Sequence, residues 1–406
     1  MTGKTVLILG GGVGGIVTAN ALRKQLAPEH HIVVVDKLGV YLFTPSLLWQ
    51  MVGWRQAERI TRDLKLLLLP GIEIVQAEVV GIDPERNRVE TNSENLSYDF
   101  LVIALGADLA PEAMPGFGDS AHSFFDLDGT AALWNDLQQF KGGRAAVLVS
   151  SMPFKCPAAP YEAAMLLDDY FRKRGDRSEV DLSLYTPEPA PMGVAGPDMG
   201  RAVVEMLESK GISFNPELKA SGIDPGQKEI HFEDGRQESF DFLAAVPPHQ
   251  PPQAVKNSPL GNEAGWVLVD KETLLTKYEN IYAIGDVTAI TLANGKPLPK
   301  AGVFAHGEGE IVATRISAEI RGENARDLYD GIGYCWIETG GGSAAFAIGQ
   351  FYAEPDPVVP LPKSGRLWHW SKVMFESYWL GGSFSREASR VGLNLGAKIF
   401  GIPASL

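Results

Sequence analysis

The sequence has few of the features that mark a secreted, membrane-spanning or nucleic-acid-binding protein. Its two cysteines, Cys156 and Cys335, are too few for a disulfide framework and for a zinc or iron–sulfur site. No apolar run approaches the roughly 20 residues that a membrane span needs, and the amino-terminal residues lack the pattern of a secretory signal. A net charge of −14 argues against general nucleic-acid binding. We therefore expect a protein without a metal centre, in the cytosol or on the cytosolic face of a membrane.

The amino-terminal stretch "KTVLILGGGVGGIVTANALRKQL" predicts a buried strand, a glycine turn and a helix. Gly10, Gly12 and Gly15 have the spacing G-x-G-x-x-G, in which the second glycine lets the backbone approach a pyrophosphate. The next predicted strand, "HIVVVDK", ends at Asp36, where a carboxylate would bond a ribose hydroxyl. A glycine-rich turn without a ligand is the alternative. With strand, helix and acid all in place, a dinucleotide site is the better interpretation.

Two later stretches indicate which dinucleotide binds. "YDFLVIALGA" predicts a strand that leads to Ala104 and Gly106, and "ENIYAIGDVTAI" predicts one that leads to Gly285 and Asp286. Both resemble stretches of the FAD-binding, disulfide-reductase-like superfamily, which makes FAD the predicted cofactor, although Gly285-Asp286 alone could be an ordinary turn. The FAD domain would be split between residues 1–110 and 255–325. Residues 111–254 alternate between strand and helix patterns and predict a second Rossmann-like domain.

The second domain lacks a glycine fingerprint at the position where a nicotinamide cofactor would need one. The predicted strand "RAAVLVS" is followed by Met152-Pro153-Phe154-Lys155-Cys156-Pro157, whose prolines and bulky side chains block close approach of a pyrophosphate. We predict that this domain binds no NADH. Cys156 precedes a predicted helix and adjoins Lys155, and both features would lower the pKa of its thiol. The alternative is that both cysteines are inert core thiols.

Five stretches resemble the sulfide:quinone oxidoreductases and their flavocytochrome c relatives: "YLFTPSLLWQMVGWR", "PFKCPAAPYEAA", "PLPKAGVFAHGEGEIVA", "GYCWIETG" and "KVMFESYWL". The resemblance implies that Cys156 and Cys335 form a disulfide or sulfur-bridged pair that sulfide attacks. Electrons would pass to FAD and then to a membrane quinone. The implied fold is α/β, with two Rossmann-like domains and a carboxy-terminal region, 326–406, built from a β-hairpin and amphipathic helices.

The chain departs from the family pattern at two places. Many members carry a third cysteine in a segment where this chain has Phe124 and Phe125. FAD is therefore expected to bind non-covalently, and the chain is either a two-cysteine variant or one that passes sulfur to a small thiol or a growing polysulfide. Relatives often carry glutamate where this chain has His306. That difference leaves the proton-handling residues open.

The resemblance also carries over further residues. Glu162, one turn into the helix after Cys156, could relay a proton or could be a solvated helix carboxylate. Gly302 begins a helix whose amino terminus would face the flavin, with Lys300 beside it and Pro45 against the flavin edge. Further predicted contacts of the cofactor are Lys37 and Val79. The predicted quinone contacts are Lys372, Phe375 and His306.

The carboxy-terminal residues mix basic and aromatic side chains, a composition typical of interfacial amphipathic helices. The resemblance therefore predicts a monotopic protein on a membrane surface. The alternative is a helical arm packed on the FAD domain or on a partner in a homo-oligomer.

Other functions stay open at this stage. A non-pumping NADH:quinone oxidoreductase has the same architecture but needs the missing glycines. A soluble flavocytochrome c-like sulfide dehydrogenase does not need the basic aromatic tail. A flavin-binding scaffold or redox sensor would need inert cysteines.

Overall fold

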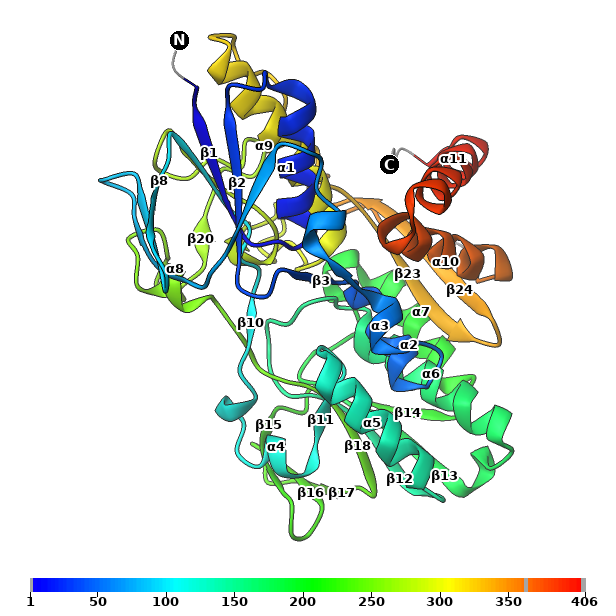
Figure 1. Cartoon of the computed structure of the whole chain (residues 1–406). Helices are drawn as coiled ribbons and strands as arrows, with labels where there is room; N and C mark the ends of the chain where they lie inside the picture. Colours follow the sequence, from blue (N-terminus) through cyan, green and yellow to red (C-terminus); the bar gives the residue numbers. More distant parts are fainter. Residues whose placement is uncertain (1–2, 361–363, 403–406) are drawn as a thin grey trace.

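A computed structural model describes residues 3–360 and 364–402. Parts of the predicted carboxy-terminal region, residues 361–363 and 403–406, lie outside the described residues. Two α/β units lie one above the other in Figure 1, and the carboxy-terminal elements lie along one side of both.

The first unit is built around a five-stranded parallel sheet. Its strands, in spatial order, are β21 (Ile281–Ala283), β9 (Phe100–Ile103), β1 (Thr5–Leu9), β2 (His31–Asp36) and β5 (Ile72–Gln76). Parallel strands that are covered on both faces need continuous apolar runs, and β1 and β2 have them. Helices α1 (Val13–Gln25) and α9 (Gly302–Ile320) pack side by side on this sheet (Figure 1). The sheet thus joins segments from both ends of the predicted FAD domain.

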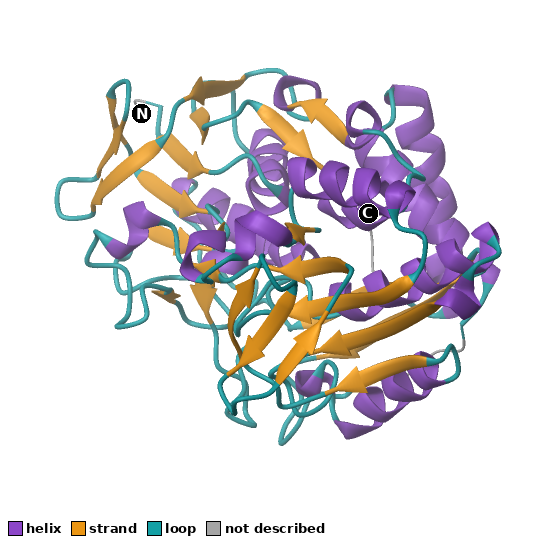
Figure 2. Ribbon diagram, turned by 90° about the horizontal axis from the view of Figure 1, so that it is seen from below, coloured by secondary structure: helices purple, strands orange, loops and turns teal. Residues whose placement is uncertain are grey.

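The second unit is a five-stranded parallel sheet formed by the middle of the chain. Its strands, in spatial order, are β11 (His122–Ser123), β18 (Phe242–Val246), β12 (Gly143–Val149), β13 (Val180–Tyr185) and β14 (Ile212–Asn215). Its helices are α5 (Leu127–Gln139), α6 (Ala159–Arg174) and α7 (Pro197–Glu208). Seen from below, helices flank the strands (Figure 2). The predicted fold class, with two dinucleotide-binding-type units, is confirmed.

Smaller elements complete the two units and the crossing between them. One antiparallel meander consists of β6 (Val79–Asp83), β7 (Arg88–Thr91) and β8 (Asn95–Ser97), and the other of β15 (Ala220–Asp224), β16 (Glu229–Phe232) and β17 (Gln237–Ser239). The crossing between the units is made by β10 (Asp108–Leu109) paired with β19 (His249–Gln250). The remaining short elements include β3 (Val40–Leu42), β4 (Thr61–Asp63), β20 (Val267–Leu268), β22 (Thr288–Ala289), α2 (Leu47–Met51), α3 (Ala57–Ile60), α4 (Phe117–Ser120) and α8 (Gln253–Lys256).

The carboxy-terminal region is a hairpin followed by two helices. The hairpin pairs β23 (Ile332–Gly340) with β24 (Ser343–Gln350), and the helices are α10 (Arg366–Leu380) and α11 (Ser383–Phe400). Helix α10 is tied to the first unit, because Arg55 of that unit forms an ion pair with Glu376 at 2.8 Å and Arg62 bonds the Leu380 carbonyl. The hairpin lies against α6 of the second unit. The region therefore connects both units.

Among the described residues, no helix is both long enough and apolar enough to cross a membrane.

Candidate active site

Cys156 lies in an irregular loop between β12 and α6, which takes the place of a tight glycine turn. Its backbone has φ = 51°, in the left-handed region that residues other than glycine rarely adopt. The Cys156 N–H donates to the Lys300 carbonyl at 2.7 Å, and the Cys156 carbonyl accepts from the Ala159 N–H at 2.9 Å. These bonds hold the thiol beside the segment that leads into α9, and strain of this kind often accompanies a functional site.

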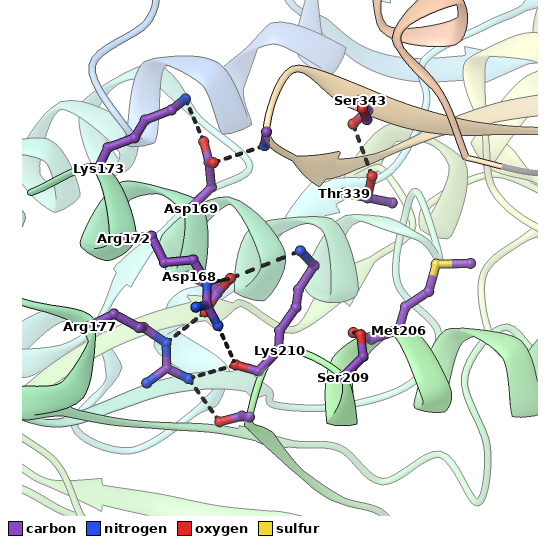
Figure 3. Close-up of polar contacts among 12 residues, drawn as sticks. Asp168, Asp169, Arg172, Lys173, Arg177, Met206, Ser209, Lys210, Thr339 and Ser343 are labelled. Carbon is purple, nitrogen blue, oxygen red and sulfur yellow. Dashed lines mark hydrogen bonds and ion pairs between the residues drawn. The ribbon is translucent and has the colours of Figure 1, made fainter. Parts of the chain in front are cut away.

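Cys335 lies on β23, and the hairpin is fixed to α6 through its tip. Asp169 of α6 accepts a hydrogen bond from the Gly341 N–H at 2.8 Å and pairs with Lys173 at 2.6 Å (Figure 3). A Cβ on Gly340 would lie 2.8 Å from the Asp169 Cβ, so only glycine permits this approach. Helix α6, which begins just after Cys156, therefore sets the position of the strand that carries Cys335.

The two cysteines are free thiols that line one apolar cavity of about 130 Å³. Aromatic and apolar side chains make up most of its wall, among them Phe154, Met192, Phe304, Tyr334 and Phe351. The charged residues in the described lining are Glu188 and Lys300. Glu188 accepts from the Tyr161 hydroxyl, and Lys300 donates to the carbonyls of Asp286 and Thr288. The cavity therefore surrounds the thiols mainly with apolar side chains, and its one carboxylate in the described lining is bonded to Tyr161.

The electrostatics of the thiols contradict the expectation from sequence. Burial, together with the charge of Glu162, raises the pKa of Cys156 to about 12. Burial also raises the pKa of Cys335 well above its ordinary value. Lys155 does not offset this, because its ammonium donates to the Ala107 carbonyl at 3.1 Å. The prediction that the helix and Lys155 lower the pKa of Cys156 is wrong, because burial raises that pKa. The nearby cation that does lower the pKa of Cys156 is Lys372.

These pKa directions predict slow alkylation of the reduced protein. At pH 8 both thiols stay protonated, so we expect iodoacetamide to react about tenfold or more slowly than with free cysteine, and the rate to rise with pH toward 12. Glu162→Gln removes a negative charge near both sulfurs and should speed the reaction. Rapid alkylation at pH 7, followed by mass spectrometry, would contradict this.

Glu162 is buried and faces a lysine from the carboxy-terminal region. Its carboxylate accepts a hydrogen bond from the Lys372 ammonium, and both side chains are almost fully buried. Burial raises the pKa of Glu162 to about 7, although Lys372 lowers it and Glu338 raises it further. The alternative of a solvated helix carboxylate is therefore excluded. Lys372 also lies near Cys335, whose pKa it lowers.

The three predicted quinone residues lie on two helices, His306 on α9 and Lys372 and Phe375 on α10. Lys372 faces the cysteines, whereas Phe375 packs 5.0 Å from the ring of Trp336 and 6.4 Å from that of Trp379. His306 approaches the edge of Trp379 at 6.1 Å and pairs with Glu310 at 3.7 Å. Phe375 and His306 therefore share an aromatic neighbour, and Lys372 belongs to the thiol side.

The glycine turn of the first unit has the shape of a pyrophosphate cradle. Gly10 has φ = 103°, and a Cβ on Gly15 would lie 1.9 Å from the Gly10 carbonyl, so both positions need glycine. A Cβ on Gly12 would meet nothing within 4 Å, so open space lies in front of the helix amino terminus. Asp36 holds this turn by accepting from the Gly11 N–H at 2.8 Å. These residues fit the predicted dinucleotide.

The other predicted cofactor residues lie in several segments of the first unit. Asp286 lies in a one-turn 3₁₀ helix after β21. The Asp286 carbonyl accepts a hydrogen bond from the Lys300 ammonium, which also lies 3.7 Å from the centre of the Trp266 ring. Gly302 begins α9, and a Cβ added at this position would lie 3.5 Å from the side chain of Val13, the first residue of α1. Ala104 and Gly106 follow β9, Val79 begins β6, and Lys37 and Pro45 are exposed.

A variant of the glycine turn tests the cradle. Gly12→Val should fold, because the site is open, yet purify with little bound FAD, since the side chain occupies the space that a pyrophosphate needs. The flavin-to-protein absorbance ratio measures this. The matched control is Gly118→Val, an exposed position with equally open space. Equal flavin content in both variants would contradict the assignment.

Sequence reasoning missed several buried ionisable residues. Glu308 of α9 is fully buried, accepts from the Gly285 N–H at 2.6 Å, and leaves its other oxygen without a partner among the described residues. Glu338 of β23 is fully buried and pairs with His369 of α10. A charged residue inside an otherwise apolar stretch is the sequence feature that could have indicated these buried groups. Only the fold shows which residues they contact.

Comparison with known proteins shows which families and structures this chain resembles. A family model described as pyridine nucleotide-disulphide oxidoreductase matches residues 4–309. The mitochondrial sulfide:quinone oxidoreductase of Mus musculus is 27% identical, covering 96% of this chain and 90% of the relative. The sulfide-quinone reductase of Aquifex aeolicus is 30% identical, covering 93% and 90%. The crystal structure of the sulfide:quinone oxidoreductase from Aquifex aeolicus superposes with a TM-score of 0.86 at 27% identity, covering 99% of this chain and 96% of that one.

Proposed function

Because the chain belongs to the sulfide:quinone oxidoreductases of the pyridine nucleotide-disulphide oxidoreductase family, we propose that it oxidises sulfide and reduces a quinone. It is a flavoprotein with FAD as its cofactor. The observation that carries the proposal for this chain is that its two cysteines line one apolar cavity. That cavity adjoins the start of α9, whose first residue lies against the glycine turn.

The cysteines supply the sulfur chemistry. Hydrosulfide attacks the bond between the two sulfurs of the oxidised pair, its sulfur bonds to Cys335, and Cys156 leaves as a thiolate. The thiolate and the Cys335 persulfide then join through the added sulfur, which releases one proton and two electrons. The glycine turn at Gly10, Gly12 and Gly15, held by Asp36, would bind FAD, which would supply the two-electron redox chemistry between the sulfurs and the quinone. The apolar wall keeps water away from the persulfide, and Lys372 stabilises the thiolate by its charge.

Steady-state kinetics with two electron donors test this function. Sulfide should support reduction of a short-chain quinone, and NADH should not, because Pro153, Phe154 and Pro157 occupy the loop where a pyrophosphate would need glycines. Turnover with NADH and none with sulfide would assign the chain to the non-pumping NADH:quinone oxidoreductases instead.

The quinone and membrane contacts belong to the carboxy-terminal helices in this proposal. Exposed apolar side chains form a stripe along α11 at Phe384, Val391, Leu395 and Ile399, spaced seven, four and four residues apart. The same helix carries three basic residues and one acidic residue, Glu387. Such a helix lies in the interface of a bilayer with its apolar face in the lipid. Phe375 and His306, which both neighbour Trp379, would face a quinone that enters from there.

Substitution of the stripe measures its contribution to membrane binding. Phe384→Ser with Ile399→Ser removes two side chains that are 87% and 67% exposed. Each apolar side chain contributes about 1.5 kcal/mol or more when buried. We therefore expect affinity for anionic vesicles to fall about a hundredfold in a flotation assay. Val80→Ser, an exposed apolar residue of β6, is the matched control. Unchanged flotation of the double variant would contradict membrane docking by α11.

A further inference from the structure

Helix α6 and strand β23 lie side by side and lead from the two cysteines to the hairpin tip. The ten residue steps from Ala159 to Asp169 on the helix span about 15 Å, at a rise of about 1.5 Å per residue. The five steps from Cys335 to Gly340 on the strand span about 17 Å. The two elements therefore have nearly the same length between the cysteines and Asp169, and a contact at Asp169 bears on the position of Cys335.

The hairpin tip rests on the side chain of Asp169 in two ways. This side chain is 7% exposed, and its Oδ1 accepts a hydrogen bond from the Gly341 N–H at 2.8 Å. Its Cβ also lies so close to Gly340 that a side chain at Gly340 would collide with it. A hydrogen bond and a steric contact thus fix the same turn of the hairpin to one residue of α6.

The neighbouring carboxylate holds α6 itself in place. Asp168 is fully buried and accepts a hydrogen bond from the Arg177 Nε at 2.6 Å. The Arg177 guanidinium also donates to the carbonyls of Lys210 and Gly211, which lie between α7 and β14. Figure 3 shows Asp168 directed toward these groups and Asp169 toward the hairpin tip. Asp168 therefore anchors the helix in the second unit, and Asp169 transmits its position to the hairpin.

Other contacts hold β23 against helices of the first unit and of the carboxy-terminal region. A Cβ on Gly333 would lie 2.3 Å from the ring of Phe304, so the start of the strand packs directly on α9. The Trp336 Nε1 donates to the Ser371 hydroxyl of α10 at 2.6 Å. Because these contacts do not involve Asp169, we expect the hairpin to stay folded when the Asp169 contact is lost, while its tip can move relative to α6.

We propose that Asp169 is a positioning residue for the sulfur pair, which holds the hairpin tip so that Cys335 stays within bonding reach of Cys156. This rests on the proposed function and deepens it. In the proposed reaction the two sulfurs alternate between a direct bond of about 2 Å and a bridge through an added sulfur. A displacement of about 1 Å at a reacting pair can cost about a hundredfold in rate. A tip that moves along α6 would carry Cys335 with it.

The equilibrium of disulfide closure measures this position without sulfide. The holoenzyme is incubated without oxygen in mixtures of reduced and oxidised dithiothreitol, and mass spectrometry after alkylation gives the closed fraction. Closure removes the two thiol hydrogens and converts oxidised dithiothreitol to its dithiol. Asp169→Ala should lower the closure constant about tenfold to a hundredfold, because the Gly341 N–H loses its acceptor. Bleaching of the flavin by sulfide should slow by a similar factor.

Three further variants separate the hydrogen bond from other effects of the substitution. Asp169→Asn keeps an oxygen that can accept from the Gly341 N–H, so it should restore most of the closure constant. Gly340→Ala leaves the carboxylate in place but forces a Cβ against it, and it should reproduce the defect of Asp169→Ala. Lys173→Met removes the ion pair with Asp169 at 2.6 Å but leaves the bond to Gly341, and it should match the native enzyme.

The outcomes distinguish the position of the strand from the function itself. Native closure and native bleaching in Asp169→Ala would overturn the proposal. A defect that Asp169→Asn does not relieve would also overturn it, because the lost acceptor would then not be the cause. If the native enzyme closes the pair in dithiothreitol but sulfide does not bleach its flavin, the proposed function fails, and the closure constants of the variants still decide the role of Asp169.

Discussion

Cys335→Ser should abolish reduction of the flavin by sulfide, slowing it by at least about three orders of magnitude, the scale expected when a reacting nucleophile is lost. A serine hydroxyl can form neither a disulfide nor a persulfide, so neither the attack nor the electron release can occur. Cys335 lies in the cavity shared with Cys156, and these are the two cysteines of the chain. Anaerobic stopped-flow absorbance measures the bleaching.

Two controls separate chemistry from damage to the fold. Dithionite should still bleach the flavin of Cys335→Ser fully, and Cys335→Ala should be equally inactive toward sulfide. A rate within about tenfold of the native enzyme in either variant, with intact flavin, would show that the cysteines are inert core thiols.

Lys372→Met should cause the largest loss of stability among single substitutions in this site. Methionine conserves the length of the side chain, but Glu162 then remains buried without the cation it pairs with, and Glu338 loses a nearby positive charge. Breaking a buried ion pair in this way costs about 3–5 kcal/mol. We expect a marked fall in the unfolding temperature, measured by calorimetry on the holoenzyme.

A double variant and a surface control complete this test. Glu162→Gln with Lys372→Met removes the stranded charge and should recover part of the loss. Lys4→Met breaks a pair with Asp99 in which the lysine side chain is half exposed, and it should change stability by less than about 1 kcal/mol. If Lys372→Met is no less stable than Lys4→Met, the buried pair does not support the structure.

The sequence predicts the fold because the main elements of each unit have recognisable patterns within short stretches of sequence. Strand β1, the glycine turn and helix α1 follow one another directly in the sequence. Gly10 and Gly15 must be glycine because a Cβ at either position would clash with the backbone. The hairpin with Cys335 and the helix after Cys156 are likewise visible as local patterns. These elements follow from the period of their apolar residues.

The electrostatics of the site could not be predicted in the same way. The partner of Glu162 is Lys372, 210 residues away, and nothing local to either residue indicates the other. Cys156 follows the local rule for a reactive thiol, yet burial by the hairpin and by α10 raises its pKa. Lys155 bonds the Ala107 carbonyl and Lys300 bonds the Asp286 carbonyl, and neither partner is indicated by the local sequence. Such partners depend on how distant elements pack.

An anaerobic titration with sulfide, followed by quinone, tests the central claim most directly. The oxidised flavin band should bleach when sulfide is added and recover when a short-chain quinone is added. Mass spectrometry of the sample should then find added sulfur on Cys156 or Cys335. A flavin that sulfide leaves oxidised but NADH bleaches would contradict the account, because the reductant would then be a nicotinamide.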